Sequence, residues 1–452
     1  MSDLRSITRL AEFAHRLSLD DLPPGAAHHA VRTIRDTIGV AVSGSRRPEN
    51  AALGALTPSL GASGPCTVIG QPTGVSAHTA AFANAASTVT LELDEGNQFA
   101  INHPSVHVLF AALAVAEDTG ASGRALVQAF VAGYEVAVRV GSVFRLRDAV
   151  HPFGTAMITG AAVAAGLLRG FSPDELAEAI RVAAGLTPAS SQSSANSGAS
   201  VRNLNTGMTA HGGVLATDLV RAGHTGEPDA LSRVYGAVLG DGSFDLDRLD
   251  AYTLDDLFIT RNYVKFYACS RWNHAPIEAM EAIRRDPAFD AGLIERIDVF
   301  TYDPATRLSG QHPQNGYAAK HSIPFNVAVR ALWGRNDVDV YTDGNVADPS
   351  LVDLTGRTSV HEDPSMTALL PGVRAGRVAV TLTNGTVIDH RIDTVYGNFD
   401  NPASEADLEA KFRALTGAHV TEAETTRLWE ACDDILNVAS LATLTSLLRI
   451  AS

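Results

Sequence analysis

Lysine is rare in this chain of 452 residues, in which Lys265, Lys320 and Lys411 are the only lysines among 35 lysines and arginines. Against 50 acidic residues this leaves a formal net charge of −15 at pH 7, with no basic cluster to offset it. Nucleic-acid binding requires a basic surface, so the composition argues against a nucleic-acid partner. Because lysine is so scarce, the position of each lysine is informative.

Cysteine and long apolar runs are scarce as well. The three cysteines, Cys66, Cys269 and Cys432, are odd in number and lack metal-ligand spacing, so we expect reduced thiols and no metal site. The N-terminus has no charged-then-apolar signal pattern, and no apolar run is long enough to span a membrane. The glycines form neither a phosphate-binding loop nor a dinucleotide fingerprint. We therefore expect a cytoplasmic protein without a membrane partner or a nucleotide cofactor.

Hydrophobic residues make up 45% of the chain and charged residues 19%, as in a well-packed soluble protein, and the length favours two domains. Helical periodicity continues to about residue 263 without a convincing strand. Residues 294–302 then read as a strand, and residues 377–392 read as a hairpin closed by Asn384-Gly385. The sequence therefore predicts a mainly α fold with an all-helical domain (residues 1–265, completed by helices in 398–452) and an inserted α+β domain (residues 266–397).

The most informative stretch is residues 91–103, which we call the acidic segment. Glu92, Asp94 and Glu95 place three carboxylates within four positions, and His103-Pro104 follows a short polar loop, ahead of an apolar helix. Proline favours the first helical position, so His103 falls at the helix cap, beside unpaired backbone N–H groups. An imidazole, a positive helix end and carboxylates in one small volume suit anionic substrates and proton transfer. A capping histidine beside a solvated acidic loop explains this stretch equally well.

Other candidates lie far apart in the sequence. His151 precedes a proline and is either a helix cap or a site residue, and Arg202 is either a surface arginine or a charge for an anion. Lys265, between two apolar residues, is expected to be buried, and burial would lower its pKa toward neutrality, where it can act as a base or an acid. His274 reads equally well as a structural histidine, and Lys320-His321 is a further candidate.

Several motifs together resemble the MmgE/PrpD family. LELDEG and NHPSVHVLFAALAVAE are followed by His-Pro-x-Gly-Thr at 151–155, VRNLNTGMTAHGGVLATDLVRAGHTG, the block 265–274 and AAKHSIPFNVAVRAL. The likeness covers nearly the whole chain in order. It implies a large helical domain with a smaller α+β lid domain, a homodimer, and a cofactor-free site between the domains. The substrates that it implies are small di- and tricarboxylates.

The resemblance also implies roles for particular residues. It places catalysis at His103, His151, Lys265 and an acidic residue, which is Asp94, or Glu92 if the loop carries an insertion. The residues expected to bind the substrate are Glu92, Asn97, Arg202, Asn205, Ser270, Arg271, His274 and Lys320. Where many family members have lysine and histidine, this chain has Arg202 and Asn205. Arginine keeps the positive charge but is no base at neutral pH.

Together these residues predict proton transfer beside a carboxylate of a polycarboxylic acid. His103 is the expected base or acid, Asp94 its orienting partner and His151 a proton donor. Arg202, Lys265 and helix N-termini would hold carboxylates and the developing enolate-like charge. Dehydration by a lyase of the 2-methylcitrate dehydratase type is the first expectation, and epimerisation, isomerisation or decarboxylation is the alternative. A protein that only binds a carboxylate metabolite is the alternative of another class.

Overall fold

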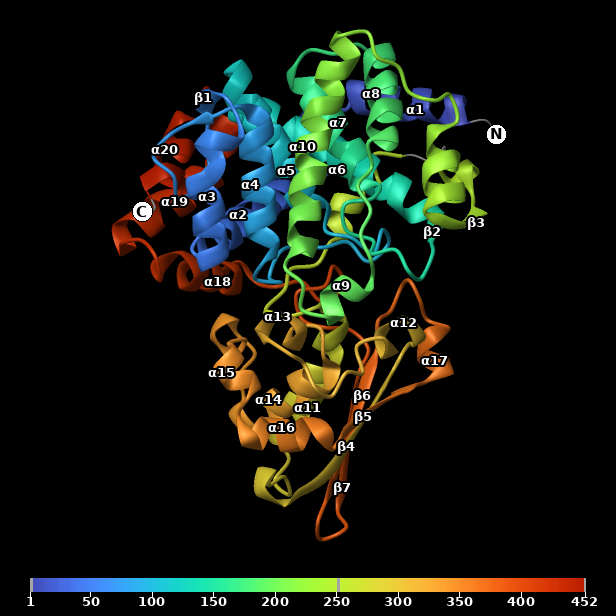
Figure 1. The fold of residues 1–452 in the computed structure, drawn as a ribbon, viewed down its shortest axis with the longest axis vertical. Coiled ribbons are helices and arrows are strands. Elements are labelled where there is room, and N and C mark those ends of the chain that lie inside the picture. The colour runs from blue at the N-terminus through green and yellow to red at the C-terminus, as the bar shows by residue number, and fades with distance from the viewer. Residues whose placement is uncertain (1–2, 250–252, 451–452) are drawn as a thin grey trace.

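The computed structural model describes residues 3–249 and 253–450, which form a larger helical part and a smaller part built on a sheet (Figure 1). The helical part begins with a series of α-helices. They are α1 (Asp3–Arg16), α2 (Ala26–Gly44), α3 (Pro48–Leu60), α4 (Ala77–Val89), α5 (Pro104–Thr119), α6 (Gly123–Val143), α7 (Met157–Leu168), α8 (Pro173–Gly185), α9 (Ser193–Asn196) and α10 (Val201–Arg221).

Local sequence signals account for the ends of these helices. α5 starts at Pro104 with His103 as its N-cap, and it ends before Gly120, whose φ of +68° favours glycine. Ser172 and Glu175 form a capping box at the start of α8, because each side chain binds the other residue's backbone N–H. The predicted start of α5 directly after His103 is confirmed.

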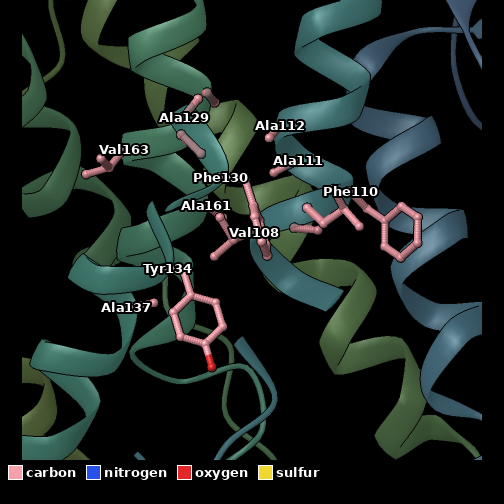
Figure 2. Packing of buried hydrophobic residues seen from close by; sticks show 14 of the residues in the cluster. Val108, Phe110, Ala111, Ala112, Ala129, Phe130, Tyr134, Ala137, Ala161 and Val163 are labelled. Atoms are coloured by element: carbon pink, nitrogen blue, oxygen red, sulfur yellow. The ribbon is translucent and has the colours of Figure 1, made fainter. Parts of the chain in front are cut away.

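One part of the core of the helical part lies between α5, α6 and α7 (Figure 2). Gly133 on α6 faces Gly160 on α7 so closely that a Cβ on either residue would clash with the carbonyl oxygen of the other. This close approach brings the backbones of α6 and α7 into direct contact within a frame of three packed helices. Tyr134 extends from the frame toward the acidic segment, where its hydroxyl donates a hydrogen bond to Oε1 of Glu95 at 2.5 Å.

The smaller part contains a four-stranded sheet in the order β5-β4-β6-β7. β4 (Ile294–Thr301) pairs in parallel with β5 (Thr358–Glu362) and antiparallel with β6 (Gly376–Leu382), which pairs antiparallel with β7 (Val387–Ile392). The β6–β7 turn contains Gly385 with φ +84°, so the predicted strand and hairpin are confirmed.

Helices cover this sheet, and α11 and α14 pack against each other and against its strands. The helices of the smaller part are α11 (His274–Arg284), α12 (Asp303–Thr306), α13 (Gly316–Ala319), α14 (Ile323–Trp333), α15 (Asp343–Val346), α16 (Pro349–Gly356) and α17 (Pro364–Thr367).

The chain then returns to the helical part with α18 (Glu405–Gly417), α19 (Glu422–Asp433) and α20 (Ala442–Ile450). α18 and α19 pack on α2, at the left of Figure 1. The apolar core of the smaller part includes Leu91 and Leu93 of the acidic segment and Leu415 of α18. The acidic segment is therefore held where the two parts meet.

The mainly α fold class is confirmed, and the structure adds features that the sequence did not indicate. Short strands lie within the helical part: β1 (Ser63–Cys66) and the antiparallel pair β2 (Phe144–Leu146) and β3 (Gly240–Phe244). The expectation that no apolar segment reaches membrane-spanning length is wrong for α6, which is long and apolar enough, although most of it is buried inside the protein. The domain limits at residues 266 and 397 stay a prediction.

Candidate active site

A small cavity of about 50 Å³ lies at the junction of the two parts. Its walls come from the acidic segment, the loop before α7, α10 and the smaller part. Six residues that the sequence predicted for the site line it together: Glu92, His103, His151, Arg202, Ser270 and Arg271.

Glu92 lies at the centre of a buried charge cluster. Its Oε1 forms an ion pair with Nη1 of Arg202, and its Oε2 lies 3.2 Å from Nζ of Lys265. Burial raises the pKa of Glu92, but these two cations outweigh burial and hold the pKa well below its ordinary value. Glu92 also has φ +55°, which is rare for a residue other than glycine, and its ion pairs hold it in this conformation.

Asp94 and His103 form a hydrogen-bonded pair beside this cluster. Nδ1 of His103 lies 2.6 Å from Oδ2 of Asp94. Burial raises the pKa of Asp94, but His103 and Lys265 reverse that shift, so the carboxylate is ionised and can only accept. Nδ1 of His103 therefore carries the proton, and Nε2 has a lone pair. Burial lowers the pKa of His103 more than Asp94 raises it, so the imidazole is neutral at pH 7.

His151 carries the opposite tautomer. Its Nδ1 accepts a hydrogen bond from the backbone N–H of Phe153 at 3.2 Å, so its proton is on Nε2. Burial and the nearby Arg202 lower its pKa well below the ordinary value, so this imidazole is neutral as well. His103 and His151 are thus two neutral histidines of the cavity wall, one with a lone pair at Nε2 and one with an N–H there.

Neither histidine is explained as a helix cap. The side chain of His103 makes no capping hydrogen bond to α5, although the residue holds the N-cap position. His151 lies six residues before α7, which begins at Met157. The capping interpretation is therefore wrong for His151, whereas His103 holds the predicted N-cap position without a capping hydrogen bond from its side chain.

The cavity carries an excess of positive charge. The guanidinium groups of Arg202, Arg271 and Arg374 line it, against the carboxylate of Glu92. Arg271 also stacks over the ring of Tyr263 at 4.5 Å. Within residues 3–249 and 253–450, neither Arg271 nor Arg374 lies within ion-pair distance of a carboxylate, and both donate to uncharged oxygens instead. These two arginines can therefore bind the carboxylates of an anionic molecule.

All three lysines of the chain contact residues 90–94. Lys265 binds two side chains of this stretch, whereas Lys320 and Lys411 bind its backbone. Nζ of Lys320 donates to the carbonyl oxygens of residues 90 and 91 at 2.9 and 3.0 Å, and Nζ of Lys411 donates to that of residue 93 at 3.0 Å. The lysines thus hold in place the short stretch that presents Glu92 and Asp94.

The expected pKa shift of Lys265 is wrong in direction. Burial lowers its pKa, but Glu92 and Asp94 outweigh burial and raise the pKa above its ordinary value. Lys265 is therefore an ammonium at neutral pH, which can act through its charge but not as a base. Lys265 and Asp94 both lie behind the cavity wall rather than on it.

Four residues predicted to bind the substrate do not line the cavity: Asn97, Asn205, His274 and Lys320. Asn97 is buried and donates to the carbonyl oxygen of Phe258 at 3.1 Å. His274 lies 3.3 Å from both the Cys269 carbonyl and the Arg271 guanidinium, and burial and Arg271 hold its pKa well below the ordinary value. It is therefore a neutral histidine that supports a wall residue, which corrects the prediction of direct contact.

Arg374 and Gln192 of the cavity wall were not predicted from the sequence, whereas His321, which also lines the cavity, was a candidate. Arg374 lies in an irregular segment without a motif, and Gln192 lies in the serine-rich loop. Nε2 of His321 lies 3.7 Å from Oε1 of Glu92, and burial lowers its pKa to about 4. The hydroxyl of Tyr317 accepts a hydrogen bond from Arg202 at 3.0 Å.

The structure offers no cluster of metal ligands within its described residues. No group of three or more histidine, cysteine, aspartate or glutamate side chains there is placed to hold a metal ion. The three cysteines are buried and unpaired.

The fold and the polar cavity define a mainly α protein of two parts, with a buried cluster of arginines, histidines and a carboxylate between them. Residues 8–243 match the MmgE/PrpD N-terminal domain, and residues 267–435 match the MmgE/PrpD C-terminal domain. The chain belongs to the MmgE/PrpD family, as the sequence motifs predicted.

Relatives of this chain in the family are enzymes. Cis-aconitate decarboxylase of Aspergillus terreus is 26% identical over 98% of this chain and 94% of its own length. Cis-aconitate decarboxylase of Mus musculus is 25% identical over 99% of this chain and 94% of its own length. A 2-methylcitrate dehydratase of Cupriavidus necator is 28% identical, over 38% of this chain and 37% of its own length.

Proposed function

We propose that this chain is a cofactor-independent lyase that dehydrates a small hydroxylated polycarboxylic acid. The observation that supports this function is the Asp94–His103 pair on a cavity lined by three guanidinium groups. A neutral imidazole oriented by a carboxylate is suited to act as a general base. Guanidinium groups bind carboxylates through paired hydrogen bonds, so the wall suits a di- or tricarboxylate.

In the proposed reaction, Nε2 of His103 takes a proton from the carbon next to a substrate carboxylate. Asp94, 2.6 Å from Nδ1, stabilises the imidazolium that forms. The electrons of the broken C–H bond form the C=C bond while the C–O bond to the neighbouring hydroxyl breaks. His103 returns its proton to the leaving hydroxyl, which departs as water.

His151 would act on the charge that develops in this reaction. Its Nε2–H can donate a hydrogen bond to the carboxylate oxygens as they take up enolate-like charge. The sequence predicted that His151 delivers a proton, but a neutral imidazole is a very weak acid, so hydrogen bonding is the role that we propose. Arg271 and Arg374 would hold the remaining carboxylates, and Lys265 would fix Glu92 and Asp94 by its charge.

Decarboxylation is the second candidate, because the cis-aconitate decarboxylases match 98–99% of this chain and the dehydratase matches 38%. In that reaction a C–C bond to one carboxylate breaks, CO₂ leaves, and a protonated group such as imidazolium returns a proton to carbon. Epimerisation would use the same transfer between carbon and His103, with the proton returned to the opposite face.

Proton NMR in D₂O distinguishes these reactions when the protein is incubated separately with 2-methylcitrate and cis-aconitate. We expect an unsaturated acid from 2-methylcitrate. A dicarboxylate formed from cis-aconitate would instead identify a decarboxylase, and deuterium exchange without a new product would point to an epimerase. If every acid stays unchanged but calorimetry detects binding, the protein is a carboxylate-binding member of the family. The His103→Ala variant controls for a contaminating activity.

A homodimer and a cytoplasmic location remain predictions from the sequence. Light scattering during size-exclusion chromatography tests the first, since a mass near twice 47.5 kDa is expected.

A further inference from the structure

A second, larger cavity adjoins the one that His103 lines. It has a volume of about 400 Å³ and lies between the helical part and the smaller part. Ile101, Pro152, Gln192 and Trp272 line both cavities, so the two share a wall. We call this space the outer cavity. The proposed dehydration does not use it.

The outer cavity has mostly apolar walls. Phe144, Leu146, Val150 and Leu370 contribute to them, together with Tyr235. The hydroxyl of Tyr235 is hydrogen-bonded to Thr187 at 2.8 Å, so the wall receives the apolar aromatic ring rather than an unpaired hydroxyl. Such walls favour hydrocarbon over a second polar group.

The arginines around the outer cavity have partners already, and Asp303 adds a carboxylate there. Arg307 pairs with Asp148 at 2.6 Å, and Arg145 lies 3.3 Å from an Asp241 oxygen. Arg147 donates to two backbone carbonyl oxygens, both at 2.8 Å. The cavity that His103 lines, which we call the inner cavity, differs from the outer cavity. Its arginines Arg271 and Arg374 have no carboxylate partner in the described part of the chain. Carboxylates therefore fit the inner cavity and an uncharged group fits the outer one.

Ile101 lies in the shared wall in an unusual conformation. Its φ of +52° is unfavourable for a β-branched residue, and 49% of the residue is exposed. Backbone strain of this kind is concentrated at functional sites, where the surrounding structure maintains it. Here it places an apolar side chain at the boundary between the two cavities.

We propose that the outer cavity binds an apolar arm of the substrate, so that the substrate class is a polycarboxylate with an unbranched alkyl chain. This inference rests on the proposed function, which places the carboxylates among the arginines of the inner cavity. The arm would then pass between Ile101 and Trp272 into the outer cavity. An acid as small as 2-methylcitrate would leave the outer cavity unused.

A series of 2-alkylcitrates, from methyl to pentyl, tests this proposal. Burial of one methylene group is expected to raise kcat/KM about fourfold until the arm fills the cavity. The dissociation constants of the matching 2-alkyl tricarballylates, which lack the hydroxyl that leaves, should fall by the same factor in calorimetry. The calorimetric series does not depend on turnover.

Two variants locate the effect. Val150→Trp should fill the outer cavity, so that kcat/KM no longer depends on the length of the alkyl chain. If that variant does not fold, Leu146→Phe, a smaller change in the same wall, tests the same expectation. Val387→Trp places the same side chain on the exposed hairpin strand β7 and should retain the full dependence.

The outcomes separate this inference from the proposed function. If the methyl acid is turned over but kcat/KM stays flat or falls for longer arms, the inference is overturned and the proposed function remains intact. Absence of turnover for every acid overturns the proposed function, and the tricarballylate affinities then decide the inference alone. A dependence on chain length that Val150→Trp and Leu146→Phe both leave unchanged would place the arm elsewhere and also overturn the inference.

Discussion

Two buried clusters, each made of acidic and basic side chains, support the acidic segment. Burial and the opposite charges shift the pKa values in the two clusters in different directions. In the first cluster, Glu92 and Asp94 face Arg202 and Lys265. The pKa of each carboxylate is lowered and the pKa of Lys265 is raised, because the opposite charges outweigh burial. All four side chains are therefore held in their charged forms.

The second cluster is the pair formed by Asp36 of α2 and Lys411 of α18, whose atoms approach to 2.7 Å. Here burial outweighs the attraction, so the pKa of Asp36 is raised and that of Lys411 is lowered. Neither residue lines the inner cavity. The difference is the number of counter-charges, since Glu92 has two cations and Asp36 has one close cation. A buried ion pair alone is thus poor evidence of a site, whereas several pairs that share one cavity wall are stronger evidence.

The largest expected effect is on turnover, from the variant His103→Ala. Loss of a positioned base should reduce kcat about 10²–10⁴-fold while the fold stays intact. Circular dichroism and thermal unfolding check the fold, and the NMR assay measures turnover. His390→Ala, which removes an exposed histidine from strand β7 far from the cavity lining, is the control and should retain turnover. Near-normal turnover of His103→Ala would remove His103 from the proton transfer.

Lys411→Met should in turn produce the largest loss of stability. It leaves Asp36 buried without its counter-charge, which typically costs about 3–5 kcal/mol in the free energy of unfolding. Because the pKa of Asp36 is already raised, its protonation relieves this cost, so the loss should be smaller at pH 5 than at pH 8. Urea unfolding at both pH values measures it. Equal losses at the two values would show that Asp36 stays ionised in the folded variant.

Arg202 should affect substrate binding more than the chemical step. Arg202→Lys keeps the charge but loses the planar group that stacks 3.9 Å over Phe153, and KM should rise about tenfold. Arg202→Ala also leaves Glu92 with one cation fewer, so KM should rise about 100-fold. Steady-state kinetics measure both variants. Wild-type KM and kcat in both would place Arg202 outside the site.

The smallest effect concerns the position of the acid limb of the pH profile. A base works in its neutral form, so kcat/KM should fall as the pH falls through the pKa of His103, which lies below its ordinary value of 6.5. Asp94 raises that pKa, so Asp94→Asn should move the limb to lower pH, besides reducing the maximum. The pH dependence of kcat/KM for the two proteins tests the sign, and a shift to higher pH would contradict it.

Much of the fold could be predicted because its signals are local. The hairpin at Asn384-Gly385 and the start of α5 at Pro104 depend on a few adjacent residues, and both are confirmed. The pair β2–β3 depends on contact between residues about 100 positions apart, with a bulge in its register, and no local pattern marks it.

The site was predictable where motifs carry it. Glu92, His103, His151 and Arg202 meet in one cavity, although they are spread over more than 100 positions. The direction of the pKa shift of Lys265 could not be predicted, because it depends on two carboxylates brought close by folding. Arg374 was missed for the same reason, since an isolated arginine in an irregular segment has no distinguishing sequence context.

The burial of the lysines has a consequence for the outer surface of the protein. Lys265 is fully buried, Lys320 is 7% exposed and the side chain of Lys411 is 7% exposed. Amine-reactive labels, lysine crosslinkers and acetylating enzymes would therefore find almost no side-chain amine on the folded protein. The arginines carry the positive charge of the exposed surface instead. A lysine introduced at a chosen surface position would thus give a nearly unique handle for attaching a probe.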